Sequence, residues 1–212
     1  MIQAVIFDFD GTLYDFSHLP RNLILAHPLD MFLMKAERTA RWEFKGKDYE
    51  TCQTLTAQYY HRISELSGKS DDKIRDWYEN RYLMAMISVL SKKYHVRSGI
   101  SELFKKLVEA NIKIAIFSDY PCVKERMSAI GMDEELQNLC SVIASAQERG
   151  AFKPAPRPFL EIAKELGVRP EHCLVVGDRL DTDGEGAHKA GMQFLKIESD
   201  CQIIDFSGIQ FI

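Results

Sequence analysis

The sequence predicts an α/β protein in which an open, parallel β-sheet carries helices on both faces and an all-helical domain is inserted. Short apolar runs end in polar or glycine residues, and amphipathic helical patterns separate these runs along most of the chain. Continuous apolar runs of about four to eight residues are typical of strands that are buried on both faces, as in a parallel sheet. One long segment without such a run predicts the insertion.

Five apolar runs are the expected strands, at residues 4–9, 112–117, 142–144, 173–176 and 193–197. Apolar residues between the runs fall on single helical faces. One example is the set Phe159, Ile162 and Leu166, and Gly167 follows where such a helix commonly ends. Strands and helices therefore alternate, which favours an open sheet covered by helices on both sides.

Residues 16–95 contain no strand-like run. Apolar residues recur there at steps of three and four, as at Leu55, Tyr59 and Ile63, which indicates helices. A second series begins after Ser70, a residue type that commonly caps a helix N-terminus. We therefore expect a helical domain at residues 16–95, inserted into an α/β domain that consists of residues 1–15 and 96–212.

The composition is that of a globular protein. Of the 212 residues, 46% are hydrophobic and 27% are charged, which argues against a disordered or fibrous chain. The net charge of −4 gives no sign of nucleic-acid binding, and the sequence lacks the run of about 18 apolar residues that predicts a membrane span. Acidic residues near the N-terminus argue against a signal peptide, and the five scattered cysteines are typical of a reducing compartment. We expect a cytoplasmic protein with no membrane partner; the sequence gives no oligomeric state.

Residues that carry chemistry follow the ends of several expected strands. Asp8 and Asp10 fall at the end of the first, Ser118 at the end of the second and Asp178 after the fourth, while Lys153 lies in a proline-rich loop. In an open parallel sheet these ends meet at one edge, where ligands bind. Two carboxylates about 4 Å apart repel by about 4 kcal/mol at an effective dielectric constant near 20, so the first pair needs a cation or a shared proton. A turn or helix cap is the alternative for that pair taken alone.

Four short motifs, found in order over nearly the whole chain, resemble those of the haloacid dehalogenase (HAD) superfamily. These motifs are a D-x-D-x-T sequence, a Ser or Thr that ends the second core strand, a Lys before a proline-rich helix start, and Gly-Asp followed by a further acid. The matching residues are Asp8-Phe9-Asp10-Gly11-Thr12, Ser118, Lys153, and Gly177-Asp178 with Asp183. The resemblance implies a Rossmann-like, HAD-like core and a helical cap inserted after the first motif.

The resemblance also implies a Mg²⁺-dependent phosphatase that hydrolyses a small-molecule phosphate monoester through an aspartyl-phosphate. Asp8 would be the nucleophile and Asp10 the general acid and base. Asp8, the backbone carbonyl of Asp10, and Asp178 would hold the Mg²⁺. The groups implied for phosphate binding are those of Lys153, Ser118, Thr12 and the backbone amide of Asp119.

Two features depart from the family pattern or leave a choice within it. Asp119 stands directly after Ser118, where the family often has Asn, and an inward carboxylate there would weaken phosphate binding. Asp181 competes with Asp183 as the second acid of the fourth motif. The spacing favours Asp183, which we expect behind the metal ligands, where it holds a metal-bound water or Lys153.

The acid at Asp10 favours phosphoryl transfer, because family members that cleave carbon–halogen bonds lack it and those that cleave phosphonates usually have a small residue there. A sugar phosphomutase would keep the same four motifs. A non-catalytic phosphate-binding or regulatory protein could use the helical domain as a partner surface. Both stay alternatives to a phosphatase, and sugar phosphates, nucleotides, phosphoglycolate and cofactor phosphates stay open as substrates.

The helical domain offers its own candidates for substrate selection. The polar loop at residues 44–47 could reach the site, and Arg21, Arg38 or Arg41 could bind a second anionic group of the substrate. Solvated surface charge is the simpler interpretation of each arginine. We expect the aromatic residues at helical spacing to form the core of this domain rather than a nucleobase platform; they are Tyr59, Tyr60, Trp77, Tyr78 and Tyr82.

Overall fold

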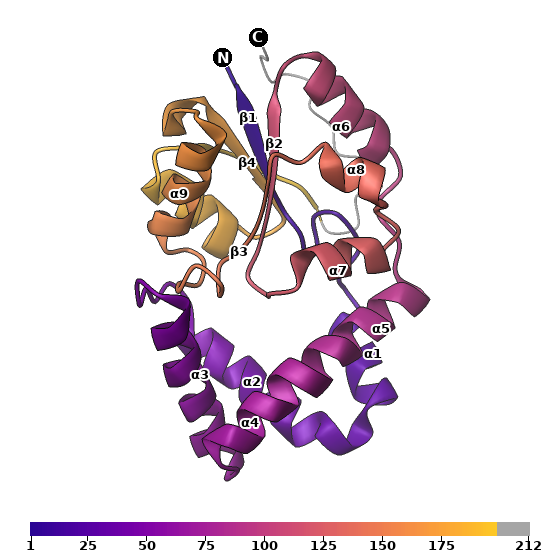
Figure 1. Ribbon diagram of the computed structural model, residues 1–212, viewed down its shortest axis with the longest axis vertical. Helices are drawn as coiled ribbons and strands as arrows, with labels where there is room; N and C mark the ends of the chain where they lie inside the picture. Colours follow the sequence, from indigo (N-terminus) through magenta and orange to yellow (C-terminus); the bar gives the residue numbers. More distant parts are fainter. Residues whose placement is uncertain (199–212) are drawn as a thin grey trace.

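The computed structural model describes residues 1–198 and contains a five-stranded sheet with helices around it (Figure 1). The strands are β1 (Ala4–Asp8), β2 (Lys113–Ser118), β3 (Val142–Ser145), β4 (Cys173–Gly177) and β5 (Gln193–Lys196). The α-helices are α1 (Leu19–Ala26), α2 (Met31–Phe44), α3 (Cys52–Ser67), α4 (Asp71–Trp77), α5 (Leu83–Lys93), α6 (Ile100–Glu109), α7 (Val123–Ala129), α8 (Glu134–Asn138), α9 (Pro156–Leu166) and α10 (Glu185–Lys189). The predicted α/β class is confirmed.

The sheet places the end of β1 at its topological centre. The strand order is β3-β2-β1-β4-β5, and each pairing is parallel. The chain first moves outward from β1 through β2 to β3 and then crosses to the other side of β1 for β4 and β5. Ligands of open α/β sheets bind beyond the carboxyl ends of strands at such a reversal. The strand order therefore predicts a ligand site at the residues that follow β1, β2 and β4.

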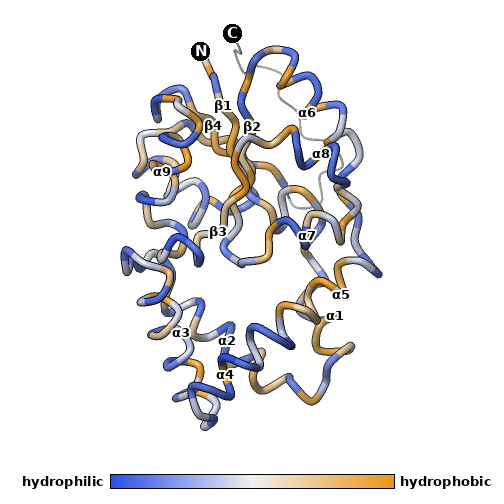
Figure 2. The backbone as a smooth tube through the Cα atoms, in the orientation of Figure 1, coloured by the Kyte–Doolittle hydropathy of each residue, from blue (hydrophilic) through white to orange (hydrophobic). Residues whose placement is uncertain are grey.

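Side chains of β1 alternate between two buried clusters, as the pleat of a strand requires. Val5 and Phe7 belong to the cluster that contains Phe104 of α6, whereas Ala4 and Ile6 belong to the cluster that contains Phe159 of α9. Figure 1 shows α6, α7 and α8 beside one face of the sheet and α9 beside the other. The apolar colour along the central strands in Figure 2 follows from this burial on both faces. This double burial explains why the strands read as continuous apolar runs.

Helices α1 to α5 lie between β1 and β2 in the sequence and gather beyond the carboxyl ends of the strands (Figure 1). A π-helical turn, Tyr78–Tyr82, joins α4 to α5. The five aromatic residues expected in the core of this segment are buried, with at most 5% of each exposed; they are Tyr59, Tyr60, Trp77, Tyr78 and Tyr82. We refer to residues 16–95 as the helical segment, and its independence as a domain stays a prediction.

A short backbone clasp joins the helical segment to the loop that carries Lys153. The amide of Gly46 donates to the carbonyl of Lys153 (3.1 Å), and the amide of Phe152 donates to the carbonyl of Lys47 (3.0 Å). A third hydrogen bond joins the same two segments, in which the amide of Tyr49 donates to the carbonyl of Gly150 (2.9 Å). The loop at residues 44–47 therefore contacts the Lys153 loop through backbone groups, and the side chain of Lys45 pairs with Asp181 after β4.

No helix within residues 1–198 is both long and apolar enough to cross a membrane. The four cysteines in that part of the chain carry free thiols, and Cys201 lies outside the described residues.

Gly150 permits the clasp, and this requirement can be tested. Its φ angle is +75°, and a Cβ atom there would lie 2.4–2.7 Å from the backbone of Thr51. We expect Gly150→Ala to lower the free energy of unfolding by about 2 kcal/mol or more, from steric overlap added to left-handed strain. Gly131→Ala is the matched control, because Gly131 has a φ of +90° but open space around the added methyl group. Urea titrations that give equal losses for the two variants would show that the close approach to Thr51 is unimportant.

Candidate active site

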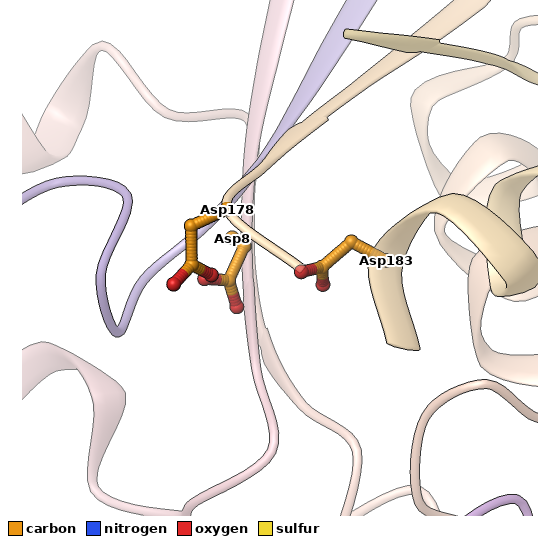
Figure 3. Close-up of side chains that lie close together, drawn as sticks. All are labelled: Asp8, Asp178 and Asp183. Carbon is orange, nitrogen blue, oxygen red and sulfur yellow. The ribbon is translucent and has the colours of Figure 1, made fainter. Parts of the chain in front are cut away.

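Three carboxylates gather where β1 and β4 end. Asp8 is the last residue of β1, Asp178 follows β4, and Asp183 lies in the π-helical turn Leu180–Gly184 that comes next. One oxygen of each lies within 4.8 Å of the others, and Figure 3 shows Asp8 beside Asp178 with Asp183 directed toward them. The sequence expectation that these acids converge at one edge of the sheet agrees with this geometry.

The buried carboxylate of Asp8 accepts one hydrogen bond at each of its two oxygens. The ammonium of Lys153 donates to its Oδ1 (2.7 Å), and the hydroxyl of Thr12 donates to its Oδ2 (3.0 Å). Burial raises the pKa of the Asp8 carboxyl well above its usual range; Asp183 adds to this rise and Lys153 opposes it. The hydroxyl of Thr12, which the sequence assigned to phosphate binding, is directed at Asp8 in this arrangement and so orients the carboxylate.

Lys153 is the buried cation of the cluster. Its ammonium also donates to Oδ1 of Asp183 (2.8 Å) and to the carbonyl of Phe117 (2.7 Å), which uses all three of its protons. Asp183 is 2% exposed, whereas Asp181 is exposed and pairs with Lys45 and Arg179 at the surface. The structure therefore places Asp183, and not Asp181, in the cluster and in contact with Lys153.

Asp178 supplies the observation that bears on a metal ion. Its Oδ1 is buried and has no hydrogen-bond partner among the described residues. Burial raises the pKa of Asp178 to about 6, with Asp183 as the next cause. A Cβ atom on Gly11 would lie 2.3 Å from Oδ2 of Asp178, so only glycine leaves room for this carboxylate beside the first motif. Oxygen donors without protein partners are what a hard divalent cation requires, and the residues present fit one.

Asp10 lies outside this cluster, in a second polar group. Its Oδ1 accepts from the guanidinium of Arg126 and from the hydroxyl of Tyr14, and its Oδ2 accepts from the hydroxyl of Ser118 (3.1 Å). Burial alone would raise the pKa of Asp10, but Arg126 and the hydrogen bonds hold that pKa below its usual value. Ser118 is thus directed at Asp10 here, and Arg126 favours the ionised form of Asp10.

Arg126 is a site residue that the sequence reasoning missed. It comes from α7, is 0% exposed, donates through Nη1 to the hydroxyl of Ser118 (2.9 Å) and lies over the ring of Phe9, 4.6 Å from its centroid. One arginine therefore connects the first motif to the second. A single basic residue in a short helix carries no sequence signal that separates it from an exposed surface charge.

The carboxylate of Asp119 does not stand free beside the cluster. Its Oδ1 accepts a hydrogen bond from the backbone amide of Lys153 (3.0 Å). Burial raises the pKa of Asp119, and the first opposing cause is the charge of Lys153. This contact fixes the Lys153 loop against the end of β2 and gives Asp119 a structural use that its position in the motif did not suggest.

The buried Asp10–Arg126 pair predicts a large and coupled effect on stability. Arg126→Met leaves the charge of Asp10 buried without its partner, so we expect the free energy of unfolding to fall by about 3–5 kcal/mol. Asp10→Asn in the same background should recover part of this loss, because it removes the stranded charge. Urea denaturation of both single variants and the double variant measures the coupling.

The control for this cycle is the surface pair of Arg62 and Glu43, whose side chains are 35% and 36% exposed. Arg62→Met should cost less than about 1 kcal/mol. Additive effects of Arg126→Met and Asp10→Asn, with no coupling between them, would contradict the proposed energetic link.

Comparisons with known proteins support the resemblance to the haloacid dehalogenase superfamily. The profile of the haloacid dehalogenase-like hydrolases matches residues 2–191. The chain is 27% identical over 207 residues to the glyceraldehyde 3-phosphate phosphatase of Methanopyrus kandleri (93% of this chain and 84% of that protein). It is 26% identical over 211 residues to the N-acylneuraminate-9-phosphatase of Rattus norvegicus (91% and 80%).

A solved structure extends the comparison to the fold. The crystal structure of a CbbY variant from Rhodobacter sphaeroides, in complex with xylulose-1,5-bisphosphate, superposes with a TM-score of 0.65 at 19% identity and covers 93% of this chain and 87% of that one. At this identity the likeness speaks for the fold alone. The profile match spans most of the chain, and the protein therefore belongs to the haloacid dehalogenase-like hydrolase family.

Proposed function

We propose that this hydrolase is a divalent-metal-dependent phosphatase, with Mg²⁺ as the cation, that cleaves a small-molecule phosphate monoester through an aspartyl-phosphate on Asp8. One observation carries the proposal. Oδ1 of Asp178 is buried beside Asp8, and no group within residues 1–198 forms a hydrogen bond with it. Curated relatives named as phosphatases of glyceraldehyde 3-phosphate and of N-acylneuraminate 9-phosphate support the choice of phosphate esters.

Asp8 and Asp178 would hold the cation, together with the backbone carbonyl of Asp10. When bound, the cation would offset the charge of these carboxylates and of the phosphate group and would polarise a phosphoryl oxygen. Asp183 would stay with Lys153 and keep that ammonium in place.

In the first step a carboxylate oxygen of Asp8 attacks phosphorus, and the ester oxygen leaves with a proton from Asp10. Because Arg126 favours the ionised form of Asp10, the carboxyl group has to turn away from Arg126 to carry that proton. Lys153 neutralises charge on the phosphoryl oxygens, and Ser118 donates to them once its hydroxyl leaves Asp10. In the second step Asp10 takes a proton from water, which attacks the phosphoryl group and frees Asp8.

The role of Asp8 predicts a loss of turnover without loss of fold. Asp8→Asn should lower kcat for phosphate release by about 10⁴-fold or more, because a carboxamide is a very poor nucleophile. Asp15→Asn is the control, since Asp15 is an exposed acid of the same loop. The measurement is phosphate release from p-nitrophenyl phosphate with Mg²⁺ and with EDTA. Full activity of Asp8→Asn would refute the assignment of the nucleophile.

The role of Asp178 predicts a change in metal affinity. Asp178→Asn should raise the Mg²⁺ concentration at half-maximal activity by about tenfold or more, because it removes a charged ligand. Asp181→Asn should leave that concentration unchanged, since Asp181 pairs with Lys45 and Arg179 away from the cluster. Mg²⁺ titrations of the two variants compare them directly, and equal midpoints would remove Asp178 from the ligand set.

A further inference from the structure

Arg41 brings a cation of the helical segment onto the rim of the site. It lies in α2, and its guanidinium carbon is 3.6 Å from the ring centroid of Tyr120 and 4.7 Å from that of Phe152. Tyr120 directly follows Asp119, and Phe152 directly precedes Lys153. The guanidinium therefore contacts both loops that border the cluster, which contradicts the simpler expectation of a solvated surface charge for this arginine.

The guanidinium is only partly satisfied. Its Nε donates to Glu37 (2.8 Å), and its Nη2 donates to the hydroxyl of Tyr78 (2.9 Å). Its Nη1 is buried and has no hydrogen-bond partner within residues 1–198. Buried donors are almost always paired, and an unpaired donor on a charged group is especially costly.

Glu37 does not remove the need for a further acceptor. Its carboxylate also accepts from the hydroxyls of Tyr59 (2.7 Å) and Tyr82 (3.3 Å). Its charge is therefore shared among three donors, and none of these contacts reaches Nη1. No described residue therefore accepts a hydrogen bond from Nη1 of Arg41.

We propose that Nη1 of Arg41 binds a carboxylate on the leaving group of the substrate, so that the enzyme selects phosphate esters of hydroxy acids. This inference rests on the proposed phosphatase function and names the substrate class of that same site. Arginine pairs with carboxylates through planar, charge-assisted hydrogen bonds, which are stronger than bonds to neutral oxygens. Lys153 contacts Asp8, so it is the cation that would lie beside the phosphoryl group. Arg41 comes from the helical segment and would therefore bind the part of the ester that is remote from phosphorus.

The burial of Nη1 sets the order of events. Because Nη1 is buried here, the leaving group can reach it only after the contacts of Arg41 with Tyr120 and Phe152 open. Closure then returns the guanidinium onto the carboxylate. The other two candidate arginines do not share this environment, since Arg21 and Arg38 are both exposed.

The test compares two esters that differ in one group. In 3-phosphoglycerate the leaving group carries a carboxylate, and in glycerol 3-phosphate it carries a hydroxymethyl group at that position. We expect the wild-type protein to favour 3-phosphoglycerate in kcat/KM. Arg41→Gln should lower that preference by about 30-fold or more, and Arg41→Lys by less. Arg38→Gln, on the exposed face of the same helix, should leave it unchanged, and thermal melting of each variant verifies the fold.

An equal loss for both esters in Arg41→Gln would show that Arg41 only packs the helical segment against the core, which overturns the inference. A wild-type enzyme that hydrolyses glycerol 3-phosphate and p-nitrophenyl phosphate without favouring 3-phosphoglycerate would overturn the inference and leave the proposed function intact. Absence of metal-dependent hydrolysis of every ester would contradict the proposed function itself.

Discussion

The buried ammonium of Lys153 is the contact on which the arrangement of the site depends. It lies 2.7 Å from Asp8, 2.8 Å from Asp183 and 2.7 Å from the carbonyl of Phe117, and thereby joins β1, β2 and the turn after β4. Without that charge, the carboxylates at the end of the sheet would repel one another in a region that excludes water. Lys153 does not hydrogen-bond Asp178, whose Oδ1 has no hydrogen-bond partner within residues 1–198, and the proposed divalent cation would bind there.

The polar groups fall into two sets that divide the chemistry. Asp8, Asp178 and Asp183 belong to the set around Lys153, and Asp10 belongs to the set around Arg126. In the proposed mechanism, the first set holds the nucleophile Asp8 near the candidate cation site. The second set favours the ionised form of Asp10, the proposed general acid and base. A group that gives a proton in one step and takes a proton in the next has to change its hydrogen-bond partners between the two steps. Asp10 would leave Arg126 in this way, and the hydroxyl of Ser118, which donates to Asp10 in the present arrangement, would then be free to donate to the phosphoryl group.

The strands and the acids at their ends are predictable from the sequence for one physical reason. Strands buried on both faces must be apolar throughout, so their ends, and the acids placed there, are visible in the chain itself. Arg126 is not predictable in this way, because 116 positions separate it from Asp10 and only the tertiary fold brings the two residues together. Arg41 does not stand out among the arginines of the sequence either, since its contacts with Tyr120 and Phe152 depend on how α2 packs on the core.

The spacing of the fourth motif favours Asp183 over Asp181 as its second acid. The structure supplies the reason, because the turn after β4 directs Asp183 inward.

Trapping the covalent intermediate tests the role of Asp8 as nucleophile most directly. Enzyme mixed with Mg²⁺ and p-nitrophenyl phosphate is quenched in acid and treated with borohydride, which reduces an aspartyl-phosphate to homoserine, and the peptides are then sequenced by mass spectrometry. If Asp8 is the nucleophile, homoserine appears at position 8 and at no other aspartate. Steady release of phosphate with Asp8 unmodified under the same quench would contradict that role, because the phosphoryl group would then pass directly to water.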